Sequence, residues 1–175
     1  TGLYIKSSSP IENLWNTRRM ISVIGTRDLS PYGKEWCERI VSSLADIPQK
    51  DRPTIVSGLA LGVDICAHNA ALRYGLPTIA VMATGPETIN PSRHSAVAET
   101  HTAESALITD YPPETAPLAI HFLRRNRIIA GLSEATILVE SKIKGGGMMT
   151  ARLADSYNRA VFALPGRVDD TRSQG

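Results

Sequence analysis

Met20-Ile21-Ser22-Val23-Ile24-Gly25-Thr26-Arg27 is the stretch that decides the fold we predict for this 175-residue chain. Its β-branched run predicts a short buried strand that closes on Gly25. Residues 31–45 follow with apolar side chains at helical spacing, which predicts a helix. A strand, a glycine-bearing loop and a helix in this order form the first unit of an α/β fold.

The same unit recurs along the chain. Strands this apolar, separated by helices, indicate a mostly parallel sheet that is covered on both faces. We therefore predict the α/β class and a Rossmann-like fold, with residues 1–19 as a lead-in to one domain at 20–175. We also expect the natural protein to continue beyond Gly175. The predicted strands are 20–25, 53–57, 77–82, 105–109, 135–140 and 160–164, and the predicted helices are 31–45, 61–74, 92–100, 118–132 and 148–157.

Composition narrows the class of protein. Hydrophobic residues make up 42% of the chain and no run approaches the roughly 18 apolar residues of a membrane span, so we expect a soluble protein without membrane contact. The start TGLYIKSSSP lacks a signal-peptide pattern, and Cys37 and Cys66 lack metal-ligand spacing. We expect a cytoplasmic protein without a bound metal or cofactor. The net charge of +2 excludes neither a nucleic acid nor a small anion as ligand.

Several loops follow the carboxyl ends of the predicted strands, where α/β sheets bind ligands. Gly25-Thr26-Arg27, the segment 57–64 and the segment 141–147 contain glycines that would let backbone amides approach an anion. Taken alone, the first is more simply explained as a plain turn, and the second as tight strand-to-helix packing. Gly145-Gly146-Gly147 after Lys144 is the strongest anion signal, although neither GxGxxG nor GxxxxGK[ST] is present.

Three arginines and an asparagine occupy residues 124–127, directly before an apolar run. Guanidinium groups next to buried chain need an anionic partner, which is either an acid of this chain or a bound ligand. We regard Glu140 as the simplest internal partner. Asp64 and His68 lie four residues apart on a predicted helix, where a helix-start acid and a core histidine are the simpler interpretation than a catalytic pair.

The ordered strings GTR, SGLALGVDICAH, TIAV, HFLRRNRIIAGLSEATILVE, GGGMMTARLA and VFALPG carry a family resemblance. Over roughly residues 21–175 the chain closely resembles the DNA-processing protein A family, also called Smf. The resemblance implies an extended Rossmann-like domain that binds and protects single-stranded DNA. It also implies loading of a RecA-type recombinase during DNA uptake in natural transformation, homodimer formation, and flanking helical and winged-helix-like domains.

The chain departs from the family pattern at three loops. Leu61 occupies a position that is basic in the family, Arg93 lies one place later than the family's basic residue, and three glycines replace an SGS sequence. Lys142 and Lys144 add charge nearby. We predict that some residues of 124–127 brace the loops and the rest face phosphate, with Arg27 as the first choice for DNA contact. The predicted DNA-binding residues are Gly25, Thr26, Arg27, Ser57, Gly58, Arg93, Arg124, Arg125, Asn126, Arg127, Lys144, Gly145, Gly146, Gly147 and Thr150.

Two other functions compete with this prediction. The related lysine-decarboxylase-like proteins cleave a nucleotide's glycosidic bond, and Gly145–Thr150 is a loose echo of their PGGxGT signature. A scaffold that recruits partners through Met148, Met149 and Leu153 is the third possibility. The sequence shows no nucleophile, metal cage or paired carboxylates of a hydrolase, so we predict a binding protein and not an enzyme.

Overall fold

The computed structural model describes residues 2–7, 9–15, 19–100 and 105–175. Its centre is a seven-stranded sheet in the order β1-β5-β4-β3-β2-β6-β7. β1 pairs antiparallel with β5, and all the other neighbours are parallel. The strands are β1 (Tyr4–Lys6), β2 (Met20–Ile24), β3 (Thr54–Ser57), β4 (Thr78–Val81), β5 (Ser105–Thr109), β6 (Ala135–Leu138) and β7 (Ala160–Ala163).

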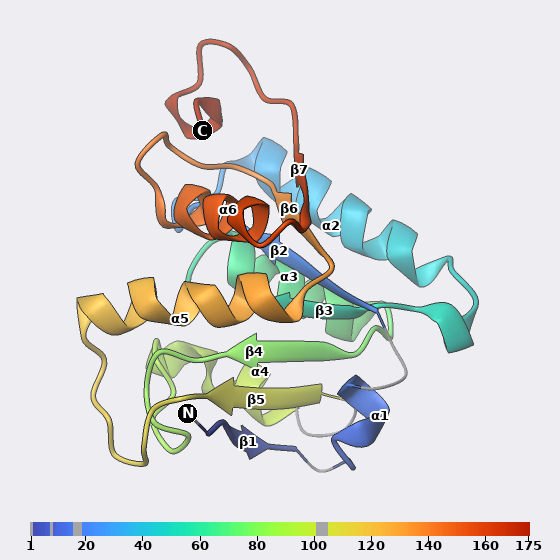
Figure 1. The fold of residues 1–175 in the computed structure, drawn as a ribbon. Helices are drawn as coiled ribbons and strands as arrows, with labels where there is room; N and C mark the ends of the chain where they lie inside the picture. Colours follow the sequence, from blue (N-terminus) through green and yellow to red (C-terminus); the bar gives the residue numbers. More distant parts are fainter. Residues whose placement is uncertain (1, 8, 16–18, 101–104) are drawn as a thin grey trace.

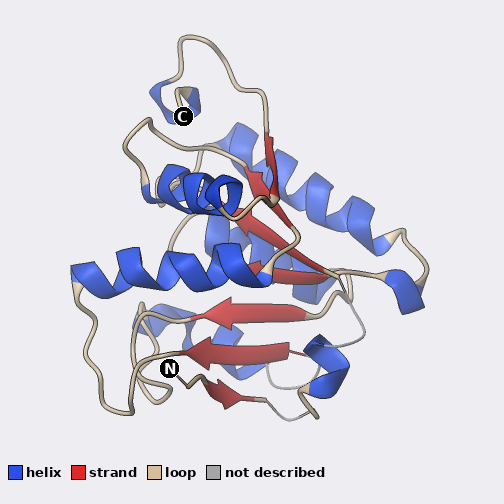
Figure 2. Ribbon diagram, in the orientation of Figure 1, coloured by secondary structure: helices blue, strands red, loops and turns tan. Residues whose placement is uncertain are grey.

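Helices cover both faces of the sheet (Figures 1 and 2). α5 and α6 pack together on one face, and α2 and α3 pack together on the other. Three short 3-10 turns lie at Gln49–Asp51, Ser92–His94 and Thr171–Ser173. The helices are α1 (Glu12–Trp15), α2 (Pro31–Ala45), α3 (Val63–Arg73), α4 (Ser95–Thr100), α5 (Ala119–Leu132) and α6 (Gly146–Ser156).

Each face of the sheet has its own core. Ile79 and Ile108 contribute to the cluster beneath α5 and α6, in which Ile128 and Ile129 of α5 are buried. Val23 lies in the opposite cluster, where residues of α2 and α3 meet the sheet. Burial of apolar surface, at about 25 cal/mol per Å², drives both layers onto the sheet and fixes the helices over their strands.

Local signals set the helix ends. Ser30 caps α2 by accepting a hydrogen bond from the Gly33 amide at 3.0 Å, and Pro31 occupies the first helical position. α3 starts after Gly62, whose φ of +78° and contact with the Thr26 carbonyl exclude a side chain. Gly75, with a φ of +70°, follows the end of the same helix.

The α/β class and the mostly parallel sheet predicted from the sequence are confirmed. The predicted segment 92–100 divides into a 3-10 turn and α4, and α6 begins two residues earlier than predicted, at Gly146. Residues 1, 8 and 16–18 of the predicted lead-in lie outside the described residues. The rest of the lead-in contains β1 and α1, which the sequence pattern did not predict; both are short, and β1 exists through its pairing with β5. None of the described helices has the length and apolar character needed to cross a membrane.

Candidate functional site

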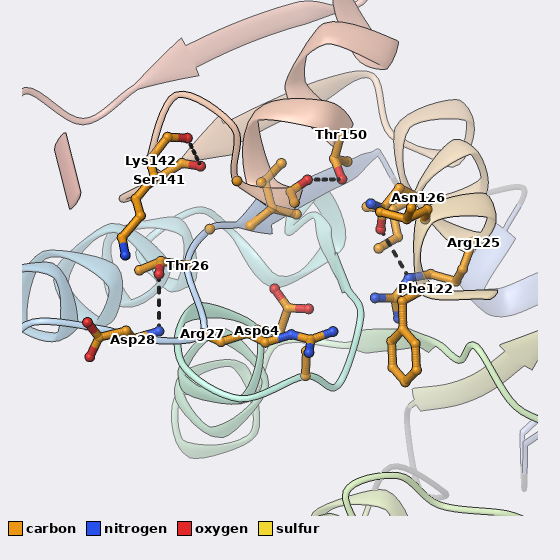
Figure 3. Close-up of a pocket in the computed structure, with 18 residues that line it drawn as sticks. Thr26, Arg27, Asp28, Asp64, Phe122, Arg125, Asn126, Ser141, Lys142 and Thr150 are labelled. Carbon is orange, nitrogen blue, oxygen red and sulfur yellow. Dashed lines mark hydrogen bonds between the residues drawn. The ribbon is translucent and has the colours of Figure 1, made fainter. Parts of the chain in front are cut away.

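A pocket of about 380 Å³ opens at the carboxyl edge of the sheet (Figure 3). The loop after β2, the inner face of α5 and the loop that leads into α6 form its walls. Segments more than a hundred residues apart therefore meet at one edge, as expected for ligand sites in α/β sheets. The pocket is lined by Ile24, Gly25, Thr26, Arg27, Asp28, Ala60, Asp64, Phe122, Leu123, Arg125, Asn126, Ile129, Ser141, Lys142, Gly145, Gly146, Gly147 and Thr150.

Glycines allow the two loops of the pocket to touch through their backbones. A Cβ on Gly25 would lie 2.6 Å from both the Glu140 carbonyl oxygen and a methyl group of Val63. A Cβ on Gly147 would lie 2.9 Å from the Gly25 Cα. The amide of Thr26 also donates to the Glu140 carbonyl at 2.7 Å, so the loop after β2 is held against the end of β6.

Gly25→Ala is expected to lower the free energy of unfolding by about 1–3 kcal/mol, because the Glu140 backbone and the Val63 side chain leave no space for the methyl group. Urea unfolding measures the loss. Gly131→Ala is the control, since it lies within α5 with nothing within 4 Å of the added methyl group. Alanine at that position should stabilise the protein by up to about 1 kcal/mol. Equal stability of Gly25→Ala and the wild type would contradict the packing described here.

The N-terminus of α6 lines the pocket. Gly145 is the N-cap and provides no side-chain cap. The Met148 amide donates to the Ser141 hydroxyl at 3.3 Å, whereas the amides of Gly146 and Gly147 have no protein acceptor within the described part of the chain. Free amides at the positive end of an eleven-residue helix are suited to an anion.

Arg125 lies beneath the pocket and is 4% exposed. Its guanidinium donates to the carbonyl oxygens of Gly58, at 2.7 Å, and Val81, so it ties α5 to the ends of β3 and β4. A Cβ on Gly58 would lie 2.6 Å from this guanidinium. Gly58 thus contacts Arg125 directly and does not line the pocket.

Asp64 supplies the negative charge that faces Arg125. Burial raises the pKa of Asp64, while Arg125, the Ser57 hydroxyl and the amides of Ala60 and Gly58 act in the opposite direction. Burial lowers the pKa of Arg125 and the Asp64 carboxylate opposes this shift. Because a guanidinium keeps its charge even when its pKa falls, Arg125 is a fixed cation at the pocket floor that faces Asp64.

Phe122 lies close to both arginines of the pocket. The guanidinium carbon of Arg27 is 5.1 Å from the centre of the ring, and that of Arg125 is 5.9 Å away. Arg27 is exposed, so its cation–π contact orients the group while leaving its N–H donors available to a ligand. Arg27 and Phe122 together form a charged and aromatic wall (Figure 3).

The structure brings nine of the fifteen predicted residues into the pocket and leaves six outside it. Ser57 is buried and its hydroxyl donates to the Val23 carbonyl. Arg127 is ion-paired with Asp110, outside the pocket. Arg124 is exposed one position away from Arg125. The nine are Gly25, Thr26, Arg27, Arg125, Asn126, Gly145, Gly146, Gly147 and Thr150; the six are Ser57, Gly58, Arg93, Arg124, Arg127 and Lys144.

The prediction that Glu140 faces the arginine cluster is wrong. The Glu140 carboxylate accepts hydrogen bonds from the amide of Ser30, at 3.0 Å, and from its hydroxyl, and is 2% exposed. A Cβ on Gly33 would lie 2.5 Å from this carboxylate. Glu140 therefore anchors the start of α2, where a negative charge is favourable, and Asp64 is the acid that faces Arg125.

Sequence reasoning did not predict the roles of Phe122 and Asp28, which also line the pocket, whereas Ser141 and Lys142 belong to the predicted loop 141–147. The position of Phe122 three residues before Arg125 was the available signal, because residues three apart share a helix face. His68, by contrast, lies in the core, 2.8 Å from the Thr78 hydroxyl. Among the described residues, no group of three or more histidine, cysteine or acidic side chains could hold a metal ion.

The sequence and the fold both match known proteins. The family model described as DNA recombination-mediator protein A matches residues 3–175. Protein Smf of Escherichia coli is 41% identical over 156 residues, which cover 89% of this chain and 41% of that protein. This chain therefore spans about two fifths of that relative.

Two solved structures share the whole fold. DNA processing protein A from Streptococcus pneumoniae superposes with a TM-score of 0.88 at 34% identity, covering 97% of this chain and 57% of that chain. The protein from Helicobacter pylori, described in terms of its unique single-stranded DNA binding mode, has a TM-score of 0.85 at 31% identity, covering 97% of this chain and 74% of that chain.

Proposed function

Because this chain belongs to the DNA recombination-mediator protein A family, we propose that its pocket binds the sugar-phosphate backbone of single-stranded DNA. The observation that carries the proposal is the meeting of two anion-attracting features in one pocket, the open amides of α6 and the exposed guanidinium of Arg27. Beneath them lies the buried guanidinium of Arg125, which faces Asp64. The H. pylori relative, which binds single-stranded DNA, supports the same ligand.

Within the proposed site, the residues divide into two roles. Arg27, Lys142 and the amides of Gly146 and Gly147 contact phosphate, since they are exposed or unpaired at the pocket surface. Arg125 and its carbonyl partners hold α5 against β3 and β4. This places the ring of Phe122 beside the bound DNA strand. Arg124 and Lys144 are exposed outside the pocket and attract the strand from a distance.

We propose that the chain acts by binding and protecting the strand rather than by catalysis. Binding along the phosphates leaves the bases free, which is compatible with handing the strand to a RecA-type recombinase during DNA uptake. We propose that it does so as a homodimer in the cytoplasm. This chain covers only part of the length of its relatives. Segments of the whole protein outside this chain are therefore expected to contribute to strand transfer and dimer formation.

The salt dependence of binding tests the ligand and the mechanism together. If four to six phosphates are neutralised, log K for oligo-dT should fall against log salt with a slope of about −3 to −4, using about 0.7 per phosphate of a single strand. Fluorescence anisotropy with labelled oligo-dT gives the slope, and a duplex of equal length should bind more weakly. A flat salt response would reject the proposal.

Unlabelled nucleotides serve as competitors in the same titration. Mononucleotides make at most one or two of the phosphate contacts, so they should displace oligo-dT only at concentrations far above that of the strand. Displacement by AMP at low concentration, or its hydrolysis, would favour a nucleotide-processing enzyme instead. Enzymatic release of adenine from AMP is followed by chromatography.

A further inference from the structure

The last residues of the chain fold back onto both loops of the pocket. The hydroxyl of Tyr32 donates to the Pro165 carbonyl at 2.6 Å, and the Gly175 amide donates to the Ser141 carbonyl at 2.9 Å. Arg172 lies between these anchors in the 3-10 turn Thr171–Ser173. Figure 1 shows this C-terminal segment beside α6. The segment therefore bridges the start of α2 and the loop that leads into α6.

Arg172 forms an ion pair with an acid on the pocket wall. Its Nε lies 3.1 Å from a carboxylate oxygen of Asp28, a residue 144 positions earlier in the chain. Asp28 directly follows Arg27, and its side chain is 70% exposed. Arg172 also lies 3.8 Å from Asp170, which already accepts the Arg172 amide within the same turn.

An unpaired carboxylate at this position would oppose the function proposed above. It would stand beside Arg27 and Lys142 and repel a phosphate that these groups attract. Exposed ion pairs contribute little to folding stability, so the effect of this pair on the free energy of unfolding should be small. The ion pair affects the electrostatic potential at the pocket directly, because Arg172 cancels the charge of Asp28.

We propose that Arg172 is a positioning residue that neutralises Asp28 and so keeps the pocket wall attractive to a phosphate of the DNA strand. The proposal rests on the proposed function. The hydrogen bonds of Pro165 and Gly175 are independent of the Arg172 side chain, so the segment stays anchored when that side chain is shortened.

A double-mutant cycle tests the proposal with labelled oligo-dT and fluorescence anisotropy. Arg172→Ala should bind about 3- to 10-fold more weakly than the wild type, the expected effect of one uncompensated charge at the pocket wall. Asp28→Asn should bind within about 2-fold of the wild type, since Arg172 already neutralises the acid that is removed and keeps Asp170 as a neighbour. In the Asp28→Asn background, Arg172→Ala should change binding by less than about 2-fold.

Arg167→Ala is the matched control. It removes the same charge from the same segment, but Arg167 pairs with Asp169 and not with an acid of the pocket. It should bind within about 2-fold of the wild type, because surface charges far from the ligand are screened. The loss in Arg172→Ala should also shrink as salt is raised, which a change in folding alone would not produce.

Two results would overturn the proposal. Wild-type affinity in Arg172→Ala shows that Asp28 needs no neutralisation. A loss that persists in Asp28→Asn/Arg172→Ala shows that Arg172 acts on the strand or on the fold directly. Failure of the wild type itself to bind oligo-dT is a different outcome, since it rejects the proposed function before the cycle is read.

Discussion

Arg125→Ala should lower the free energy of unfolding by about 3–5 kcal/mol, because it leaves buried polar groups without their cationic neighbour. The substitution removes the hydrogen bonds to the carbonyls of Gly58 and Val81 and leaves Asp64 buried without its cation. A domain of this kind is stable by about 5–15 kcal/mol, so the loss is a large share of the total. Urea unfolding followed by circular dichroism measures it.

Arg124→Ala is the control for this prediction, because Arg124 is the adjacent arginine of the same helix and is exposed. Its unfolding free energy should change by less than about 0.5 kcal/mol. A second variant, Asp64→Leu/Arg125→Met, replaces both charges with apolar groups and should recover part of the lost stability. Equal effects of Arg124→Ala and Arg125→Ala would contradict the distinct roles that the structure gives them.

Arg27→Ala should weaken binding of oligo-dT by about 10- to 100-fold without a change in melting temperature. Arg27 is the exposed guanidinium of the pocket, and a charge-assisted contact contributes about 1.5–3 kcal/mol. The contact that the substitution removes from the described part of the protein is the cation–π contact to the ring of Phe122, which is weak at an exposed site. The salt slope should also fall by about 0.7, the share of one phosphate.

Arg39→Ala provides a closely matched comparison for Arg27→Ala. Arg39 is also exposed and also lies over an aromatic ring, 5.2 Å from the centre of Trp36, but it belongs to α2 and does not line the pocket. Its oligo-dT affinity should stay within about 2-fold of the wild type. If both variants lost affinity equally, general positive charge rather than the pocket would explain binding.

Much of the pocket could be predicted from the loops. The glycines at 25 and 145–147 follow strands in the sequence, and parallel strands place their carboxyl ends at one edge of a sheet. The class of fold was therefore enough to predict that Arg27 and these glycines lie close together. Gly25 and Gly147 also let the two loops of the pocket pack closely.

The sequence shows the arginine cluster at 124–127, but it does not show which of these arginines is buried. Neighbouring residues on a helix point about 100° apart, so Arg124 and Arg125 must face different surroundings. Which of them is buried depends on how α5 rotates over the sheet, and the burial of Ile128 and Ile129 sets that rotation. Glu140 was misplaced for another reason, because its partner Ser30 is 110 residues away in the sequence.

The sequence by itself determined the α/β class, the order of the elements and the edge at which the pocket lies. These follow from periodic patterns and turn residues that act over a few neighbouring positions. The tertiary structure alone decided the partners of the charged groups: Asp64 for Arg125, Ser30 for Glu140 and Arg172 for Asp28. Such pairs form between segments far apart in the chain, so their geometry exists only after both faces of the sheet have been packed.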